Sequence, residues 1–385
     1  MINNKKNIII YLLLTGLAFH DFFKIESFKF FDITITYLRV ALALSILLLL
    51  FTGKKLEKND IVLKGFIIFA AYGLTRICGN YREFLNIYCV LVSFILLYAI
   101  INDKITIQRC INCLATIFIF FCIYGIIEII TGYHYVETYF GDENVKMLAT
   151  GMYFNENDFS AYLSVMIFYM LLSRYNKYMK ITSITVALII IAINRSLICI
   201  LGIISLLIFY WIFKKKDIIF KKKRIAITIS GIVFMTIPII KIIQNSSWYW
   251  RLYMYKYGVL NCLDNFLLGT GIGNYEKGMI SVGYTELLHS SANPHCFYLE
   301  LAGEFGMIWL ILIIVLLGYL IKHFSNIENQ KNKYYIGLIY MFSFVGMASS
   351  SCLEKNYIYL ALLLPLLVCK CNDLGCEYND ERKNC

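Results

Sequence analysis

The chain has 385 residues, of which 59% are apolar and only 16% are charged, and its mean hydropathy is +0.67. A soluble domain of this length needs far more charge on its surface, so the composition excludes an ordinary soluble protein. A net charge of +11 can indicate nucleic-acid binding, but the positive residues lie between apolar runs, and we reject nucleic acid as a partner.

The apolar residues form runs of about 18 to 24, separated by short charged clusters. A backbone in hydrocarbon must satisfy its own hydrogen bonds, and these runs do not alternate as barrel strands do. We therefore predict an all-α, polytopic membrane helix bundle, with residues 1–385 as one membrane domain. In chain order, the twelve predicted spans are 7–24, 31–52, 61–79, 84–102, 108–131, 153–173, 181–193, 197–213, 225–243, 304–321, 334–349 and 356–371.

The distribution of positive charge predicts the orientation. With the N-terminus in the cytoplasm, 23 of the 36 Lys and Arg residues fall in cytoplasmic segments and nine fall outside. Cytoplasmic loops carry the excess of Lys and Arg in membrane proteins. We therefore expect a multi-pass protein of a cytoplasmic membrane with both termini inside.

Two predicted outer segments exceed ordinary connection length, namely residues 132–152 and 244–303. Connections this long in a compact protein are usually functional. The second contains Trp248, Tyr249 and Trp250, which suit an interfacial aromatic belt and also suit stacking on sugar rings. We place the candidate active site in this extracytoplasmic loop.

The run between Lys180 and Lys214 is too long for one span and short for two. In its middle lie Asn194, Arg195 and Ser196. Two short helices that meet at an outer polar turn solve this geometry. Arg195 then lies at the mouth of the bundle and faces a cavity.

Three ionisable residues lie at membrane depth, in the outer half of their spans: Arg39, Arg76 and Glu128. Such residues are costly in a bilayer and are functional candidates. Snorkelling, or an ion pair of Arg76 with Glu128, is the structural interpretation. The functional interpretation is an outward-facing cationic cavity for an anionic ligand.

The second long loop contains the strongest local pattern. The glycine run 269–273 resembles a nucleotide-binding fingerprint only superficially, and a tight turn explains it better. His289 and His295 are candidate metal ligands, but no third ligand has suitable spacing. A histidine in a polar outer loop can also act as a general base near neutral pH, which we prefer for His295.

Four motifs in order resemble the O-antigen polymerase and O-antigen ligase superfamily of bacterial envelope glycosyltransferases. They are the stretch 154–159 with Asn157, the turn 194–196, Arg251 followed by the glycine run, and the stretch 294–299 followed by Glu304. The resemblance covers roughly 150–385. The chain departs from the family pattern at Asn194, where Ser or Thr is common, and at Cys296, where Asn is usual.

The resemblance implies transfer of a glycan from undecaprenyl diphosphate, with inversion and without metal, nucleotide or another cofactor. It implies polymerisation of oligosaccharide repeat units into a surface polysaccharide at the outer face of the bacterial cytoplasmic membrane. Flippase and chain-length regulator proteins are the implied protein partners. The implied catalytic residues are His295 and Arg195, and the implied ligands of the diphosphate and sugar are Arg251, Arg76, Arg39, Asn157 and Glu304.

Other functions stay open at this point. Ligase-type transfer of glycan to a lipid or protein acceptor uses the same motifs. A lipid-linked sugar flippase or transporter is a second class, although such proteins usually spread charges through a central cavity or show paired repeats. A non-catalytic membrane scaffold is a third class and leaves the His295 loop unexplained.

Overall fold

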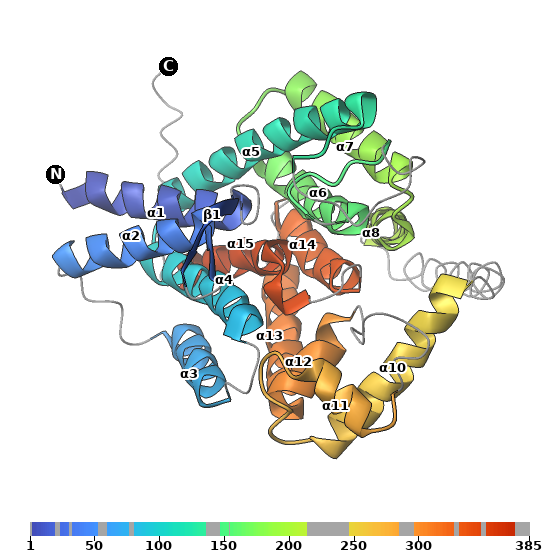
Figure 1. Cartoon of the computed structure of the whole chain (residues 1–385). Coiled ribbons are helices and arrows are strands. Elements are labelled where there is room, and N and C mark those ends of the chain that lie inside the picture. Colours follow the sequence, from blue (N-terminus) through green and yellow to red (C-terminus); the bar gives the residue numbers. More distant parts are fainter. Residues whose placement is uncertain are drawn as a thin grey trace.

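A computed structural model describes residues 2–19, 24–30, 33–52, 60–76, 81–135, 147–153, 155–213, 246–284, 296–326, 331–347 and 352–373. This part of the chain is all-helical apart from one two-stranded antiparallel hairpin, which confirms the predicted all-α class (Figure 1). The elements are α1 Ile2–Phe19, β1 Lys24–Phe30, β2 Ile33–Thr36, α2 Tyr37–Thr52, α3 Ile61–Thr75, α4 Tyr81–Ile100, α5 Lys104–Thr131, α6 Glu156–Leu172, α7 Lys177–Ile193, α8 Leu197–Phe213, α10 Ser246–Asp264, α11 Tyr275–Ser281, α12 Phe297–Phe305, α13 Met307–Asn326, α14 Asn332–Val345, η3 Cys352–Glu354 and α15 Asn356–Asp373.

Short polar residues between the apolar runs set the starts of several helices. The side chains of Asp60, Asp103, Asn155 and Asn176 accept hydrogen bonds from backbone N–H groups in the first turns of α3, α5, α6 and α7. These donors have no partner within the helix, so a capping oxygen stabilises the first turn. At the other end of α5, Gly132 adopts the left-handed conformation and ends the helix.

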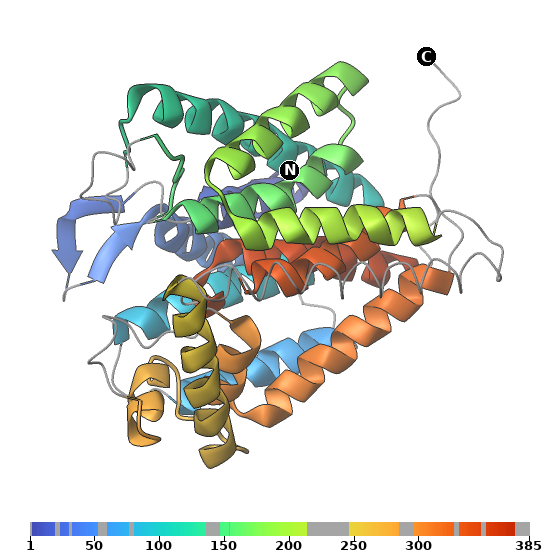
Figure 2. The ribbon, with the colours of Figure 1, turned by 90° about the vertical axis from the view of Figure 1, so that its right-hand side faces the viewer.

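The core lies around α6, α14 and α15. Almost all of α6 is buried, including the fully buried rings of Tyr162 and Tyr169, and Tyr357 at the start of α15 is also fully buried. Both views show α14 and α15 in the middle of the molecule, with α5 to α8 on one side and α3 and α10 to α13 on the other (Figures 1 and 2). The central helices therefore separate two peripheral groups.

Two of the described helices are long and apolar enough to cross a membrane, Lys104–Thr131 and Met307–Ser325. The outer face of α13 carries exposed Ile308, Ile311 and Val315. The other apolar helices are shorter: Tyr37–Leu50, Ile61–Thr75, Phe84–Ile100, Leu197–Ile208 and Asn356–Asn372. The expected dozen spans stay a prediction.

Three predicted spans have wrong boundaries. The span predicted at 7–24 ends as helix α1 at Phe19, and Lys24 already belongs to strand β1. The span predicted at 31–52 begins as strand β2, and its helix starts only at Tyr37, because the β-branched run of residues 33–36 favours extended backbone. The span predicted at 304–321 is interrupted at Gly306. Its φ of 95° is accessible to glycine but unfavourable for other residues, and α12 ends just before it. Glu304 therefore lies in the last turn of α12, and the long helix begins at Met307.

The predicted pair of short helices is confirmed, because α7 ends at Ile193 and α8 begins at Leu197. The long segment 244–303 is largely helical where it is described, with α10, α11 and the start of α12. The span predicted at 225–243 lies outside the described residues.

Candidate functional site

Asn194 follows α7, and its buried side chain ties the turn before α8 to two other segments. Its Oδ1 accepts a hydrogen bond from the backbone N–H of Ala149 at 2.9 Å, and its Nδ2 donates to the carbonyl oxygen of the same residue at 2.8 Å. Nδ2 also lies 3.2 Å from the Glu156 carbonyl oxygen and 3.1 Å from Ser160 Oγ. The two polar motifs before α6 and after α7 therefore meet at the start of α6.

Arg195 is held in an unusual backbone conformation beside this amide. Its φ is 52°, and among the described residues it is the one non-glycine residue with a positive φ. Its side chain is exposed and has no hydrogen bond or ion pair with the part of the chain that the structure describes. A strained residue persists only where its surroundings determine it. The turn therefore presents a guanidinium that can bind an anion.

The first turn of α6 carries polar side chains beside this turn. Asn155 accepts from the N–H of Asp158 at 2.9 Å, and the half-buried Asn157 donates from Nδ2 to Glu156 Oε1 at 2.9 Å. The predicted ligand Asn157 therefore lies beside Glu156, whose carbonyl oxygen the Asn194 amide contacts. The carboxylate of Asp158 is fully buried, so it needs partners.

Asn155 Nδ2 donates to Asp158 Oδ2 at 3.2 Å, and two further partners come from residues 352–357, which we call the connector. Lys355 Nζ lies 3.1 Å from Asp158 Oδ2, and the Tyr357 hydroxyl donates to Asp158 Oδ1 at 3.1 Å. Elsewhere in the connector, Asn356 Nδ2 donates to the carbonyl oxygen of Leu17 at 2.7 Å. Sequence reasoning missed this segment, although its polar residues directly before the last apolar run were a usable signal.

The connector also reaches the other side of the molecule. The N–H of Leu353 donates to Glu300 Oε1 at 3.4 Å, and Asn86 Nδ2 donates to Glu354 Oε2 at 3.4 Å. Asn86 accepts from Arg39 Nη2 at 2.7 Å. Arg39 is half-buried and is therefore engaged with Asn86 of α4.

The glycine run closes the C-terminal end of α12. The N–H of Thr270 donates to the Gly303 carbonyl oxygen at 2.7 Å, and that of Gly271 donates to the Glu304 carbonyl oxygen at 3.0 Å. Gly273 N–H donates to Glu304 Oε1 at 3.0 Å. The φ values of Gly269, Gly271 and Gly273 are positive, which confirms a tight turn. These amides bind α12, so they are not a phosphate cradle.

Arg76 forms hydrogen bonds with the same turn. Its Nη2 donates to the Gly269 carbonyl oxygen at 2.6 Å, and its own carbonyl oxygen accepts from Ile272 N–H at 3.2 Å. The interpretation that Arg76 forms an ion pair with Glu128 is therefore wrong. Glu128 accepts instead from the N–H groups of Thr150 and Gly151, at 2.9 and 2.7 Å.

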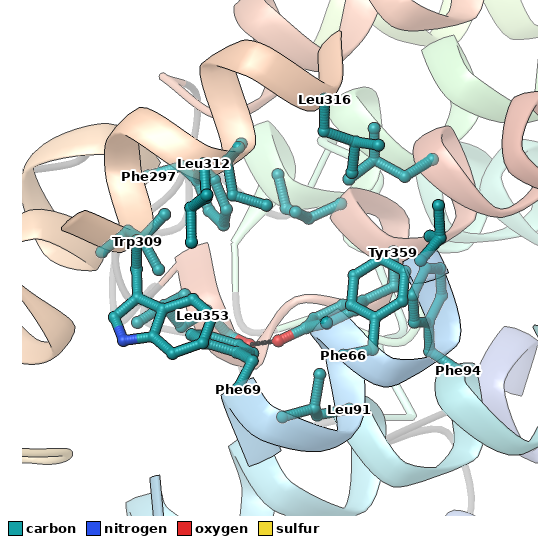
Figure 3. A pocket seen from close by; sticks show the side chains of 16 residues that line it. Phe66, Phe69, Leu91, Phe94, Phe297, Trp309, Leu312, Leu316, Leu353 and Tyr359 are labelled. Atoms are coloured by element: carbon teal, nitrogen blue, oxygen red, sulfur yellow. Dashed lines mark hydrogen bonds between the residues drawn. The ribbon is translucent and has the colours of Figure 1, made fainter. Parts of the chain in front are cut away.

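An apolar cavity of about 180 Å³ lies between α4 and α15 on one side and α3, α12 and α13 on the other (Figure 3). Leu353 of the connector is part of its wall, and the Tyr359 hydroxyl donates to the Leu353 carbonyl oxygen at 2.9 Å. Leu312 also lines the cavity while 50% of it is exposed, so the cavity reaches the apolar surface of α13. Arg195 does not line this cavity. Its walls come from α3, α4, α12, α13, α15 and the connector.

Cys296 occupies the position where the resembled family usually has Asn, directly before α12. Burial raises the pKa of its thiol, and burial raises the pKa of nearby Cys262 to about 12. Both thiols are therefore protonated at neutral pH and are poor nucleophiles. His295 lies outside the described residues, and so does the side chain of Arg251, which belongs to α10.

The chain matches no model of a known protein family, and it matches no characterised protein.

Proposed function

We propose that this chain is a multi-pass membrane glycosyltransferase that polymerises oligosaccharide repeat units linked to undecaprenyl diphosphate. The observation that carries the proposal is the exposed guanidinium of Arg195, which a strained turn holds next to the polar start of α6. A planar guanidinium can bind two phosphate oxygens at once. The two span-length apolar helices support a site at a membrane surface.

In the proposed reaction, a sugar hydroxyl of the acceptor attacks the anomeric carbon of the donor. The new carbon–oxygen bond forms as the bond to the diphosphate oxygen breaks, and the diphosphate leaves with the electron pair. The hydroxyl proton passes to His295, the candidate general base. Attack from the side opposite the diphosphate inverts the anomeric centre. Arg195 stabilises the charge that develops on the leaving group.

The apolar cavity offers a place for part of the lipid. An apolar cavity of about 150 Å³ stays dry and holds a molecule of the size of benzene. A cavity of about 180 Å³ is therefore large enough for a short stretch of an isoprenoid chain, and it reaches the surface of α13. We propose that the rest of the chain lies along that surface in the bilayer.

The test is polymerisation by the purified full-length chain in detergent, with lipid-linked repeat units as the substrate. We expect Arg195→Ala to lose at least about 10²-fold in rate, and Arg195→Lys also to fail because the ammonium lacks the planar fork. Arg174→Ala is the matched control, because Arg174 is an exposed arginine just beyond the opposite end of α6. Full activity of Arg195→Ala removes this residue from the site.

The product pattern separates the proposal from the alternatives. A deletion strain whose surface glycan collapses to a single repeat supports a polymerase, whereas free lipid-linked polymer in that strain indicates a ligase. Turnover in detergent, where no membrane separates two compartments, excludes a pure flippase. Absence of any product with intact, folded protein would contradict the proposal.

A further inference from the structure

We infer that Asn194 is the positioning residue for Arg195: its side-chain amide holds the turn in the conformation that presents the guanidinium to the diphosphate. This inference rests on the proposed function, because it assigns Arg195 a diphosphate ligand. It concerns a residue that does not itself touch the substrate.

The backbone of Arg195 is the first reason. A φ of 52° is disfavoured for any residue with a Cβ, and it needs surrounding contacts that leave the chain no alternative. The exposed side chain of Arg195 makes no such contact with the described residues. Its own backbone N–H donates to the Ala192 carbonyl oxygen at 3.1 Å, and the further constraint comes from its neighbours in the turn.

Asn194 supplies that constraint. Its amide bonds both backbone groups of Ala149 and also reaches the Glu156 carbonyl oxygen and Ser160 Oγ. In addition, its backbone N–H donates to the Ile190 carbonyl oxygen at 2.9 Å. Two segments that are distant in sequence, at Ala149 and at the start of α6, thus fix the side chain of the residue that directly precedes the strained one.

The chemistry of these partners specifies an amide. Asn can accept one hydrogen bond and donate two from the same planar group, whereas Ser has a single donor and Asp has none when ionised. A carboxylate at this position would face the carbonyl oxygens of Ala149 and Glu156 without a donor. The group is buried, so water cannot replace a lost partner.

The experiment is a double-mutant cycle on binding of undecaprenyl diphosphate to the purified full chain in detergent. We expect Arg195→Ala and Asn194→Ala each to weaken binding by roughly 10- to 100-fold, since a misplaced group loses most of its effect. The double variant should bind no more weakly than Arg195→Ala alone, because Asn194 acts through Arg195. If the fold-losses in affinity of the two single variants multiplied in the double variant, the two residues would act independently and the inference would be overturned.

Two further variants keep the test decisive if Asn194→Ala does not fold. Asn194→Asp should bind as weakly as the alanine variant, and Asn194→Ser, which keeps one donor, should fall between that variant and the natural chain. Ser160→Ala is the control, because it removes one partner of the amide and leaves both bonds to Ala149. We expect it to change the Kd less than threefold, on the order of one weak hydrogen bond.

The outcomes also distinguish this inference from the proposed function. If Arg195→Ala binds undecaprenyl diphosphate normally, the diphosphate site is wrong and both fail. If Arg195→Ala weakens binding while Asn194→Ala and Asn194→Asp do not, the proposed function stands and the positioning role of Asn194 fails.

Discussion

The Asn194 turn and the glycine run both join distant segments at the ends of short helices, but they are built from different groups. At the turn, a side-chain amide satisfies backbone groups and leaves the cation of Arg195 exposed. At the glycine run, backbone N–H groups donate to the end of α12, and the guanidinium of Arg76 donates a hydrogen bond to the Gly269 carbonyl oxygen. An arginine near a predicted outer surface can therefore be a structural clamp or a candidate ligand, and its partners decide which.

The connector makes the first region the more sensitive to loss of a single charge. We predict that Lys355→Ala lowers the free energy of unfolding by about 3–5 kcal/mol, because it leaves the fully buried carboxylate of Asp158 without its cation. Thermal melting of the purified chain would measure this loss. Asp158→Asn combined with Lys355→Ala should recover much of it, since no uncompensated charge remains.

The control for this prediction is Lys177→Ala, at an exposed lysine in the first turn of α7. It should change the melting temperature little. If Lys355→Ala melts like the control, the buried ion pair does not hold the start of α6, and the contrast between the two regions is lost.

The glycine run should be the more sensitive to added volume. A Cβ on Gly269 would lie 2.3 Å from the Glu304 carbonyl oxygen, and the φ of 68° is unfavourable for any other residue. We predict that Gly269→Ala lowers the free energy of unfolding by about 2–4 kcal/mol, because backbone atoms cannot move aside as a side-chain tip can.

Gly318 in α13 provides the matched control. A Cβ there would meet nothing within 4 Å, so Gly318→Ala should be neutral or slightly stabilising in a helix. Melting of both variants checks this comparison. Equal stability of Gly269→Ala and the natural chain would mean that the run does not close the end of α12 as tightly as its geometry indicates.

The sequence predicted local secondary structure better than it predicted contacts between residues far apart in the chain. The paired short helices around Asn194 were predictable, because spacing between charged residues limits helix length. The hairpin before Tyr37 and the helix break at Gly306 were not predictable. Both lie in apolar runs, and hydropathy does not distinguish β-branched residues in a strand from helix or show the φ of a glycine. The pair Lys355 with Asp158 could not be found, since nothing local relates residues so far apart.

The candidate site divides in the same way. Arg195 was predicted at a polar turn at the mouth of the bundle, facing a cavity; it lies at that turn with an exposed side chain, and it does not line the apolar cavity. Arg76 and Glu304 were predicted as ligands of the substrate, yet both bind the glycine run. Both arginines were predicted to bind an anion near the outer surface, so only their three-dimensional partners separate them.

The smallest expected effect tests whether activity merely follows stability. Asp103 caps α5, far from both regions in the chain. Burial raises the pKa of its carboxyl, but the N–H and hydroxyl of Thr106 and the ammonium of Lys6 outweigh burial and lower the pKa overall. A lowered folded-state pKa means that ionised Asp103 stabilises the fold above its unfolded-state pKa of about 3.9, and that this contribution disappears as the pH falls through the folded-state value.

Asp103→Asn keeps a good capping oxygen and removes only the charge. We therefore expect a loss of less than about 1 kcal/mol at neutral pH, because the side chain is 46% exposed and solvent screens it. The difference in melting temperature from the natural chain should shrink below about pH 4, where Asp103 itself becomes protonated. Polymerisation at neutral pH should be unchanged, since the residue is remote from Arg195. If Asp103→Asn instead lowered the polymerisation rate as much as Arg195→Ala does, loss of activity would only reflect loss of stability. The effect of Arg195→Ala would then be no evidence that the exposed guanidinium binds the diphosphate.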